Sequence, residues 1–336
     1  MKKIINNPMD FVNETLEGII LAYPDQFRFP EGEKRGIVRA DIPVNGKVAI
    51  ATGGGSGHLP VFLGYVGKGL ADGASVGNVF SSPSADAMFN VAKEIHGGKG
   101  VLLLYGHYFG DKMNFDLASE MLEEEGIVVK SIRVSDDVAS APRESWKNRR
   151  GVAGIFFAYK IAGACAEANE PLDKVYTIAE KTVTNLATMG VALSSCIIPA
   201  SGKPTFSMDE DEMEMGMGIH GEPGIKRTKL RTANEIAEEI IHYLTDDLSL
   251  SAGDEVAVLV NGSGATPLEE LYIVNREVHL LLQERDINIY KTYVGEYATS
   301  MDMAGCSITL LKIDEELKKY LDAEANSPFF KQFGGI

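Results

Sequence analysis

The sequence predicts an α/β protein made of two α/β domains, the first with a largely parallel sheet flanked by helices and the second with a smaller mixed sheet. Short apolar runs typical of buried strands alternate with helical patterns along the chain. Strand, loop, helix and strand follow one another in the first half, as in parallel sheets with helices on both faces. The length of 336 residues favours two domains, and the pattern changes near Gly190, so the expected domains are residues 1–190 and 191–336.

The first domain is expected to begin with a helix over residues 8–24, because Leu16, Ile19, Ile20 and Tyr23 share one helical face. Three buried strands and further helices follow. The strands are expected at 47–52, 101–105 and 127–134, and the helices at 114–125, 152–169 and 171–188.

The second domain is expected to contain four strands and two amphipathic helices. The strands are expected at 191–199, 255–260, 287–293 and 307–311, and the helices at 235–244 and 269–284. Residues 208–217 form an acidic, methionine-rich run, which we interpret as an exposed segment.

The bulk composition excludes several classes of function. The formal net charge of −16 argues against binding to bare nucleic acid or to an anionic membrane. The start of the chain does not resemble a signal peptide, and no apolar run is long enough to span a membrane. The three cysteines are far apart, which is typical of a reducing cytoplasm and indicates no zinc site. We therefore expect a cytoplasmic protein.

The most informative stretch is residues 218–224, where His220 lies between glycines. Glycines on both sides leave the imidazole unscreened and allow turn conformations closed to other residues. A neutral imidazole is a nucleophile near pH 7, because its unperturbed pKa is about 6.5. The stretch indicates chemistry or ligand contact; the alternative is a surface turn that happens to hold a histidine.

A second glycine-rich stretch, Gly53–His58, follows the strand expected at 47–52. Backbone N–H groups in such a loop can hold a small polar ligand. The stretch lacks the Gly-Lys-Ser/Thr of a P-loop, and the acidic residue of a dinucleotide site is missing, so we expect no nucleotide cofactor. A purely structural role is the alternative. We also expect no metal, because the cysteines lack the spacing of a zinc site and the acidic run lacks that of a calcium loop.

Asp111 follows Gly110 at the end of a predicted strand, where ligands bind in parallel sheets. It is a candidate general base for a hydroxyl group, or alternatively the cap of the next helix. Arg149 and Arg150 are candidates for phosphate binding, although a salt bridge at a domain edge is the favoured interpretation. Thr266 is a plausible helix cap.

Six ordered motifs together resemble the dihydroxyacetone kinase family, specifically its dihydroxyacetone-binding subunit, over nearly the whole chain. They are GGGSGH at 53–58, GDxMNF at 110–115, RRGVAG at 149–154, GIHGEPG at 218–224, LVNGSGATPLEELYI at 259–273 and TSMDMAGCSITLLK at 299–312.

The resemblance implies a role for each matching residue. His220 matches the histidine that attacks the ketone carbon and holds the substrate as a hemiaminal, and His58 matches an acid/base residue. Asp111 matches the carboxylate that contacts the hydroxyl to be phosphorylated. The substrate-binding residues implied are Gly55, Ser56, Gly57, His58, Asp111 and His220. The resemblance also implies a homodimer, with the nucleotide on a separate helical subunit.

One departure concerns the stretch before Asp111. Kinase subunits usually show Lys-Asn-Tyr-x-Gly-Asp, whereas this chain has Gly106 and His107 in place of the lysine and asparagine. Loss of one positioned charge typically lowers the rate of such a reaction by about 10² to 10³, whereas capture of a ketone by His220 does not need it.

The departure leaves two functions open. In the favoured one, the chain binds dihydroxyacetone covalently as a sensor and coactivates a transcription regulator of a dihydroxyacetone kinase operon. In the alternative, it is the substrate-binding subunit of a working dihydroxyacetone kinase, or of a kinase for a related ketose. Whether phosphoryl transfer is retained stays open, and so does the identity of the partner protein.

Overall fold

The computed structural model describes residues 2–334, so Met1 and residues 335–336, at the ends of the two expected domains, lie outside the described residues. The chain divides into two compact units. The first unit comprises Met1–Val134, Phe156–Thr182 and Glu316–Ile336, and the second comprises Ser135–Ile155 and Val183–Glu315. This differs from a single boundary at residue 190, because each unit also takes up a segment from the other half of the chain.

The first unit contains a six-stranded sheet in the order β1-β2-β4-β3-β5-β6. The pairs β3–β4, β3–β5 and β5–β6 are parallel, and the two pairs at the β1 edge are antiparallel, so the expected largely parallel sheet is confirmed. The strands are β1 (Phe27–Arg28), β2 (Gly36–Arg39), β3 (Ala49–Ser56), β4 (Gly73–Val79), β5 (Val101–Gly106) and β6 (Val129–Val134).

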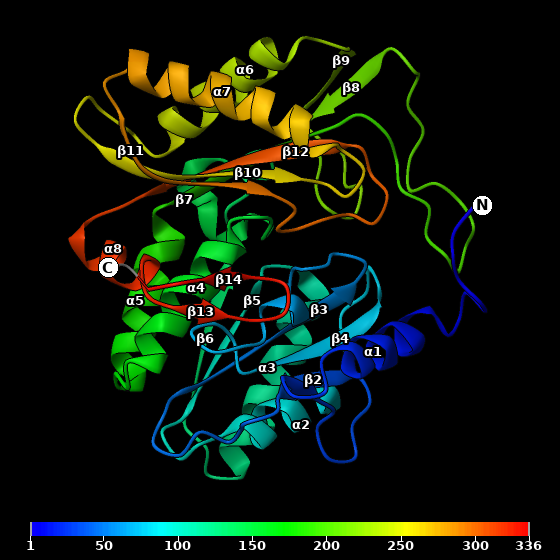
Figure 1. The fold of residues 1–336 in the computed structure, drawn as a ribbon, viewed down its shortest axis with the longest axis vertical. Coiled ribbons are helices and arrows are strands. Elements are labelled where there is room, and N and C mark those ends of the chain that lie inside the picture. Colours follow the sequence, from blue (N-terminus) through cyan, green and yellow to red (C-terminus); the bar gives the residue numbers. More distant parts are fainter. Residues whose placement is uncertain (1, 335–336) are drawn as a thin grey trace. The chain divides into compact units, whose positions relative to one another are not determined.

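Helices cover both faces of this sheet, as Figure 1 shows. Ala49 and Ala51 of β3 pack on the side of α2 (Ala85–Ile95) and α3 (Phe109–Glu124). On the opposite face, Ala74 of β4 packs with α1 (Phe11–Ala22), and Thr52 hydrogen bonds the Tyr159 hydroxyl of α4 (Ile155–Glu167) at 2.6 Å. The alternation of a strand therefore explains why both faces of β3 are buried. The next helix, α5 (Leu172–Thr184), follows α4 in the chain.

The glycines of the Gly53–His58 stretch belong largely to β3 and do not form the expected loop. Gly53, Gly54 and Gly55 continue the parallel pairing with β4. A Cβ at Gly53 would lie 2.1 Å from the Ser75 Oγ and 2.8 Å from its carbonyl oxygen. β3 can therefore continue through these positions because glycine has no side chain to collide with β4.

We expect Gly53→Ala to lower the free energy of unfolding by about 1–3 kcal/mol, because the added methyl group overpacks the contact between β3 and β4. The control is Gly18→Ala in α1, where a Cβ meets nothing within 4 Å. That change should stabilise the helix by about 0.5–1 kcal/mol. Urea unfolding followed by circular dichroism measures both; a Gly53→Ala midpoint at or above that of the unaltered protein would contradict the argument.

The second unit holds another six-stranded sheet, in the order β11-β10-β12-β7-β8-β9, and β10–β11 is its parallel pair. The expected mixed sheet is confirmed, but it has as many strands as the first sheet and is not smaller. The strands are β7 (Leu186–Ala192), β8 (Glu212–Met215), β9 (Lys226–Lys229), β10 (Glu255–Gly262), β11 (Asn288–Gly295) and β12 (Gly305–Lys312). Apolar residues of α6 (Ala233–Asp247) and α7 (Leu268–Glu284) bury one face of it.

Two expectations about this sheet were wrong in part. Residues 209–211 of the acidic run are exposed as expected, but residues 212–215 form β8. Met213 and Met215 of this strand are fully buried in the core, because alternation turns them to the sheet's apolar face. The strand expected at 191–199 ends at Ala192 instead. Beyond it, the N–H of Leu193 bonds the Ala304 carbonyl oxygen and the chain turns away from the ladder.

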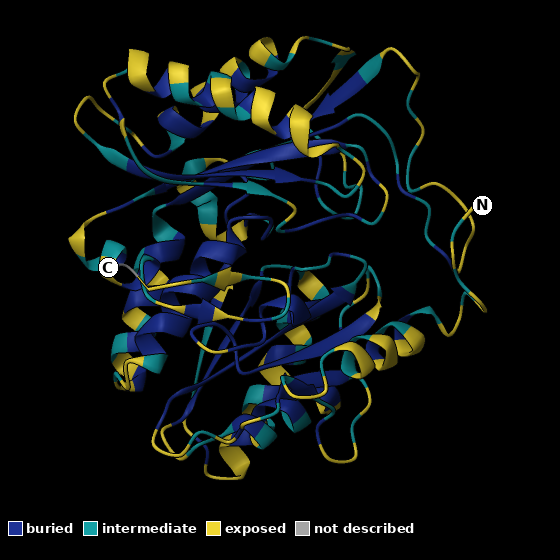
Figure 2. Ribbon diagram, viewed as in Figure 1, coloured by how far each residue is buried: buried dark blue, intermediate teal, exposed yellow. Residues whose placement is uncertain are grey.

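Residues 316–334 complete the first unit. After α8 (Glu315–Leu321), the short strands β13 (Ala325–Asn326) and β14 (Lys331–Gln332) pair, and the Ser327 hydroxyl donates to the Gly64 carbonyl oxygen at 2.7 Å. Figure 2 shows that the strands of both sheets are mostly buried, whereas exposed residues gather on the outer sides of the helices. Within residues 2–334, each helix is too short or too polar to cross a bilayer.

Candidate functional site

His220 lies in the connection between β8 and β9, and its side chain is held by a carboxylate two residues away. The ring Nδ1 is 2.9 Å from the Glu222 Oε1, and the backbone N–H of His220 donates to the Glu222 Oε2 at 2.9 Å. The His220 side chain is 21% exposed. The imidazole is therefore accessible but fixed in orientation, rather than unscreened as the glycine spacing suggested.

Glu222 determines which ring nitrogen of His220 carries the proton. Burial opposes ionisation of the Glu222 carboxyl, but the hydrogen bond with His220 and the charges of His220 and Arg150 outweigh this and lower its pKa to about 2. An ionised carboxylate only accepts hydrogen bonds, so the Nδ1 of His220 donates. In the neutral ring the lone pair then lies on Nε2, which is the nucleophilic nitrogen.

The glycines around His220 allow neighbouring atoms to pack closely against the backbone, and one of them allows a turn. A Cβ at Gly218 would lie 2.3 Å from the Glu222 Oε2 and 2.8 Å from the Arg150 Nη1. Gly221 has a φ of 82°, in the left-handed region that favours glycine. A Cβ at Gly224 would lie 2.0 Å from the Met215 carbonyl oxygen. The motif thus allows the segment to fold tightly around Glu222.

A pocket in the second unit adjoins the His220 segment. Gly218 and Ile219 form part of its wall, and polar groups from several other elements complete it. The polar lining side chains are Asp137, Asn261, Ser263, Ser300 and Ser307.

Two residues of the Asn261–Pro267 motif have structural partners. The Asn261 side chain is saturated by hydrogen bonds to the backbone of Tyr297 and Ala298 and to Ser307, so it shapes this wall. Thr266 does not cap α7, because its hydroxyl bonds the backbone N–H and carbonyl of Gly305.

The other predicted site residues belong to the first unit. Gly55 and Ser56 end β3, and Gly57 follows with a φ of 102°. His58 is 1% exposed, and its ring stacks on Phe80 at a centroid distance of 4.8 Å with an interplanar angle of 16°. These residues line one small pocket together with residues of α1.

Asp111 lies inside the first turn of α3 and is buried, so it is not the cap of that helix. A carboxylate in this position is favoured by the helix dipole. Burial raises the pKa of Tyr159, the hydrogen bond with Thr52 opposes this rise, and the charge of Asp111 adds to it. Gly106 is the buried last residue of β5, and the His107 N–H bonds the Val134 carbonyl oxygen.

Arg149 and Arg150 form ion pairs, as the favoured interpretation predicted. Arg149 is 1% exposed and makes a two-bond pair with Asp247, at 2.9 and 2.5 Å. Arg150 pairs with Asp137 at 2.8 Å, and its Nη1 lies 4.0 Å from the Glu222 Oε2. Burial raises the pKa of the Asp137 carboxyl to about 7, although the charge of Arg150 opposes this.

The sequence pattern indicated His220 but not the carboxylate that holds it. Glu222 stands two residues after the histidine, and this His-x-Glu spacing in a glycine turn was the available signal. Arg150 was expected to form a salt bridge, but nothing in the sequence indicated that its partners are Asp137 and Glu222. Within residues 2–334, no three His, Cys, Asp or Glu side chains are grouped to hold a metal ion.

The fold and this segment define a class: an α/β protein of two sheet-containing units that carries a histidine oriented by a glutamate. The Dak1 domain model matches residues 17–329, and the chain belongs to this family.

Relatives and solved structures agree with this membership. The chain is 46% identical over 331 residues to the dihydroxyacetone-binding subunit DhaK of a PTS-dependent dihydroxyacetone kinase from Listeria innocua, covering 98% of this chain and 99% of the relative. It is 44% identical to a D-erythrulose kinase from Mycolicibacterium smegmatis, with 99% of this chain matching 57% of that longer protein. The structure of the dihydroxyacetone kinase operon co-activator DhaQ superimposes with a TM-score of 0.89 at 32% identity, over 96% of this chain and 98% of that one.

Proposed function

We propose that the chain captures dihydroxyacetone or a related short ketose through His220 and acts as the substrate-binding subunit of a kinase. The observation that carries the proposal is the Glu222–His220 pair, which leaves Nε2 as a nucleophile on a partly exposed ring. Family membership supports it, since relatives named as dihydroxyacetone-binding kinase subunits match over almost their full length. The erythrulose kinases among the relatives are the reason for naming a class of ketose rather than one compound.

In the capture step, the Nε2 of His220 and a proton add across the C=O bond of the ketone. The Nε2 lone pair forms a bond to the carbonyl carbon, and the π pair of the C=O bond moves to oxygen. The carbonyl oxygen takes up a proton and the ring loses its Nδ1 proton, so the hemiaminal is neutral and no co-reactant is consumed. The Glu222 carboxylate, 2.9 Å from Nδ1, stabilises the positive charge that the ring carries before the proton leaves. An alcohol has no carbonyl carbon to attack, so glycerol is not captured.

The first-unit residues take the roles that the family resemblance implies. Gly55, Ser56 and Gly57 would contact the ketose oxygens, and His58 would act as an acid/base. Asp111, buried in the first turn of α3, would accept the proton of the hydroxyl that is phosphorylated. A nucleotide held by a separate helical subunit would supply the phosphoryl group.

The sensor is retained as the second candidate. Gly106, in place of the lysine usual in kinase subunits, and the likeness to the DhaQ co-activator support a ligand sensor that engages a transcription regulator. The relatives named as kinases and kinase subunits favour the role of a kinase subunit over the role of a sensor.

The two roles are separated by a turnover assay. The purified chain is mixed with a nucleotide-loaded helical subunit of a dihydroxyacetone kinase, and formation of dihydroxyacetone phosphate is followed. We expect turnover, and we expect Gly106→Lys to raise it by up to about 10² by restoring a positioned charge. Gly110→Ala is unsuitable as a control, since a Cβ there would lie 2.6 Å from the Ser82 Oγ. Gly18→Lys serves instead, because Gly18 is exposed and a Cβ there meets nothing within 4 Å. Intact ketose capture without turnover in either Gly106 form would support the sensor.

A further inference from the structure

Arg150 is anchored more firmly than a surface arginine. Its Nε and Nη2 both lie 2.8 Å from the Asp137 Oδ2, and Nη2 also donates to the Gly216 carbonyl oxygen at 3.1 Å. Its backbone N–H donates to the Ser140 Oγ at 3.0 Å. The Asp137 side chain is 3% exposed and that of Arg150 is 16% exposed. The guanidinium is therefore held by the Asp137 carboxylate and the Gly216 carbonyl oxygen. Its third nitrogen, Nη1, faces the His220 segment.

That nitrogen faces the carboxylate that holds His220. The Arg150 Nη1 lies 4.0 Å from the Glu222 Oε2, the oxygen that also accepts the His220 backbone N–H. The approach depends on Gly218, because a Cβ there would lie within 2.8 Å of both partners. A side chain at position 218 would separate the two charges or displace the segment.

Losing this charge would act on His220 indirectly. The carboxylate of Glu222 is partly buried, and without a nearby cation a partly buried anion gains more by turning toward water. A Glu222 side chain that turns to solvent no longer accepts from Nδ1. The His220 ring would then distribute its proton between both nitrogens and lose its fixed orientation.

We propose that Arg150, anchored by Asp137, is a positioning residue: it holds the Glu222 carboxylate in the place from which Glu222 fixes the orientation of the His220 ring and its Nδ1–H tautomer. The importance of this inference for ketose capture rests on the proposed function, but the positioning role itself does not. The Asp137–Arg150–Glu222–His220 chain and its effect on the tautomer can be measured without any ketose.

The first measurement is ¹⁵N NMR of the full chain labelled at histidine, without ligand. The unaltered protein should show His220 as the Nδ1–H tautomer, and Arg150→Gln should shift it toward a mixture. Arg150→Lys should restore part of the Nδ1–H signal, since a cation is kept. Arg143→Gln is the matched control: Arg143 lies in the same chain segment, and its ion pair is with Asp247 rather than with Asp137 or Glu222. It should leave the His220 signals unchanged.

The second measurement is the dihydroxyacetone concentration that gives half-maximal adduct in intact-protein mass spectrometry. Arg150→Gln should raise this concentration about tenfold. The figure is taken from metal sites, where loss of a residue that orients a ligating histidine costs about 10-fold to 100-fold in affinity or activity. Arg150→Lys should raise the concentration less. If Arg150→Gln unfolds, Gly218→Ala provides the second test, because its Cβ displaces the same pair.

The outcomes separate this inference from the proposed function. An unchanged His220 tautomer in Arg150→Gln overturns the positioning role, whatever happens to capture. A shifted tautomer in a protein that never captures the ketose supports the positioning role and rejects the proposed function. An equal loss of signal in Arg150→Gln and Arg143→Gln indicates general destabilisation and also overturns it.

Discussion

Replacing His220 with asparagine is expected to abolish covalent capture of dihydroxyacetone. The amide nitrogen of asparagine is not nucleophilic, so no carbon–nitrogen bond can form, while the side chain keeps a polar group near Glu222. Native, reductant-free mass spectrometry should show the unaltered protein with one added dihydroxyacetone, and His220→Asn with none at the same concentration. We expect a complete loss rather than a graded one, because the histidine itself supplies the bond.

His242→Asn is the control for this experiment. His242 lies on α6 in the same unit, its side chain is 67% exposed, and its contact is an i,i+4 ion pair with Asp246. Its replacement should leave the adduct intact. An adduct of equal abundance on His220→Asn would place the capture elsewhere, for example at a lysine, and would remove the basis of both candidate functions.

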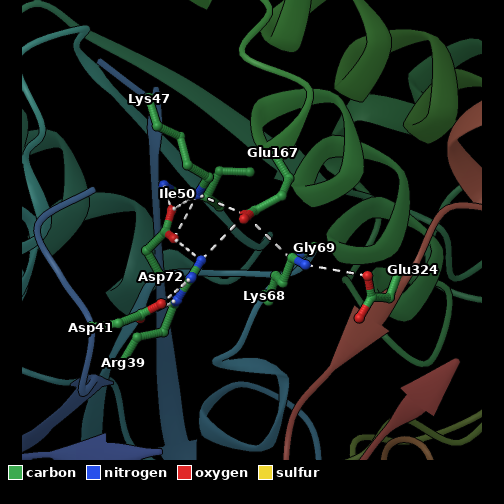
Figure 3. A network of polar contacts seen from close by, with 9 residues as sticks. All are labelled: Arg39, Asp41, Lys47, Ile50, Lys68, Gly69, Asp72, Glu167 and Glu324. Carbon is green, nitrogen blue, oxygen red and sulfur yellow. Dashed lines mark hydrogen bonds and ion pairs between the residues drawn. The ribbon is translucent and has the colours of Figure 1, made fainter. Parts of the chain in front are cut away.

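Replacing Asp72 with alanine should cause the largest loss of stability among single changes in the first unit. Figure 3 shows Asp72 between Lys47 and Arg39. Its carboxylate accepts from the Lys47 Nζ at 2.6 and 2.7 Å, from the Arg39 Nη1 at 3.0 Å and from the Ile50 N–H at 2.9 Å. The side chains of Asp72, Lys47 and Arg39 are 3 to 5% exposed. Removing the anion leaves two buried cations that share Glu167, at 3.2 Å from Arg39 and 3.5 Å from Lys47, as their remaining partly buried partner. Breaking a buried pair costs about 3–5 kcal/mol.

Asp41→Ala is the matched control, because Asp41 also pairs with Arg39 at 2.8 Å but is 66% exposed. An exposed pair contributes about 0–1 kcal/mol. Hydrogen exchange of peptides from β3 and β4 in increasing urea measures the first unit, whereas Trp146 fluorescence follows the second. Comparable losses for the two variants would show that burial does not set the strength of this network.

Local sequence patterns located most of the regular elements of this protein. Buried strands such as β5 and β10 appear as continuous apolar runs, and α7 as an apolar stripe, because burial on the core leaves its period in the sequence. The elements that were misjudged depend on neighbours. The glycines of β3 look like a loop, since only the packed β4 and the segment near Phe80 show why a side chain is excluded there. Residues 212–215 of the acidic run form β8 because β7 and β9 offer them hydrogen bonds.

The α/β class, the family and the histidine on which the proposed chemistry depends were predictable from the amino-acid sequence, because composition, hydrophobic period and ordered motifs are properties of the chain. How that histidine is held depends on the folded structure. Asp137, Arg150 and Glu222 come together through the packing of segments far apart in the chain. Electrostatic interactions fall with distance in space and not along the sequence, so the protonation and orientation of His220 became visible only once the fold brought these charges together.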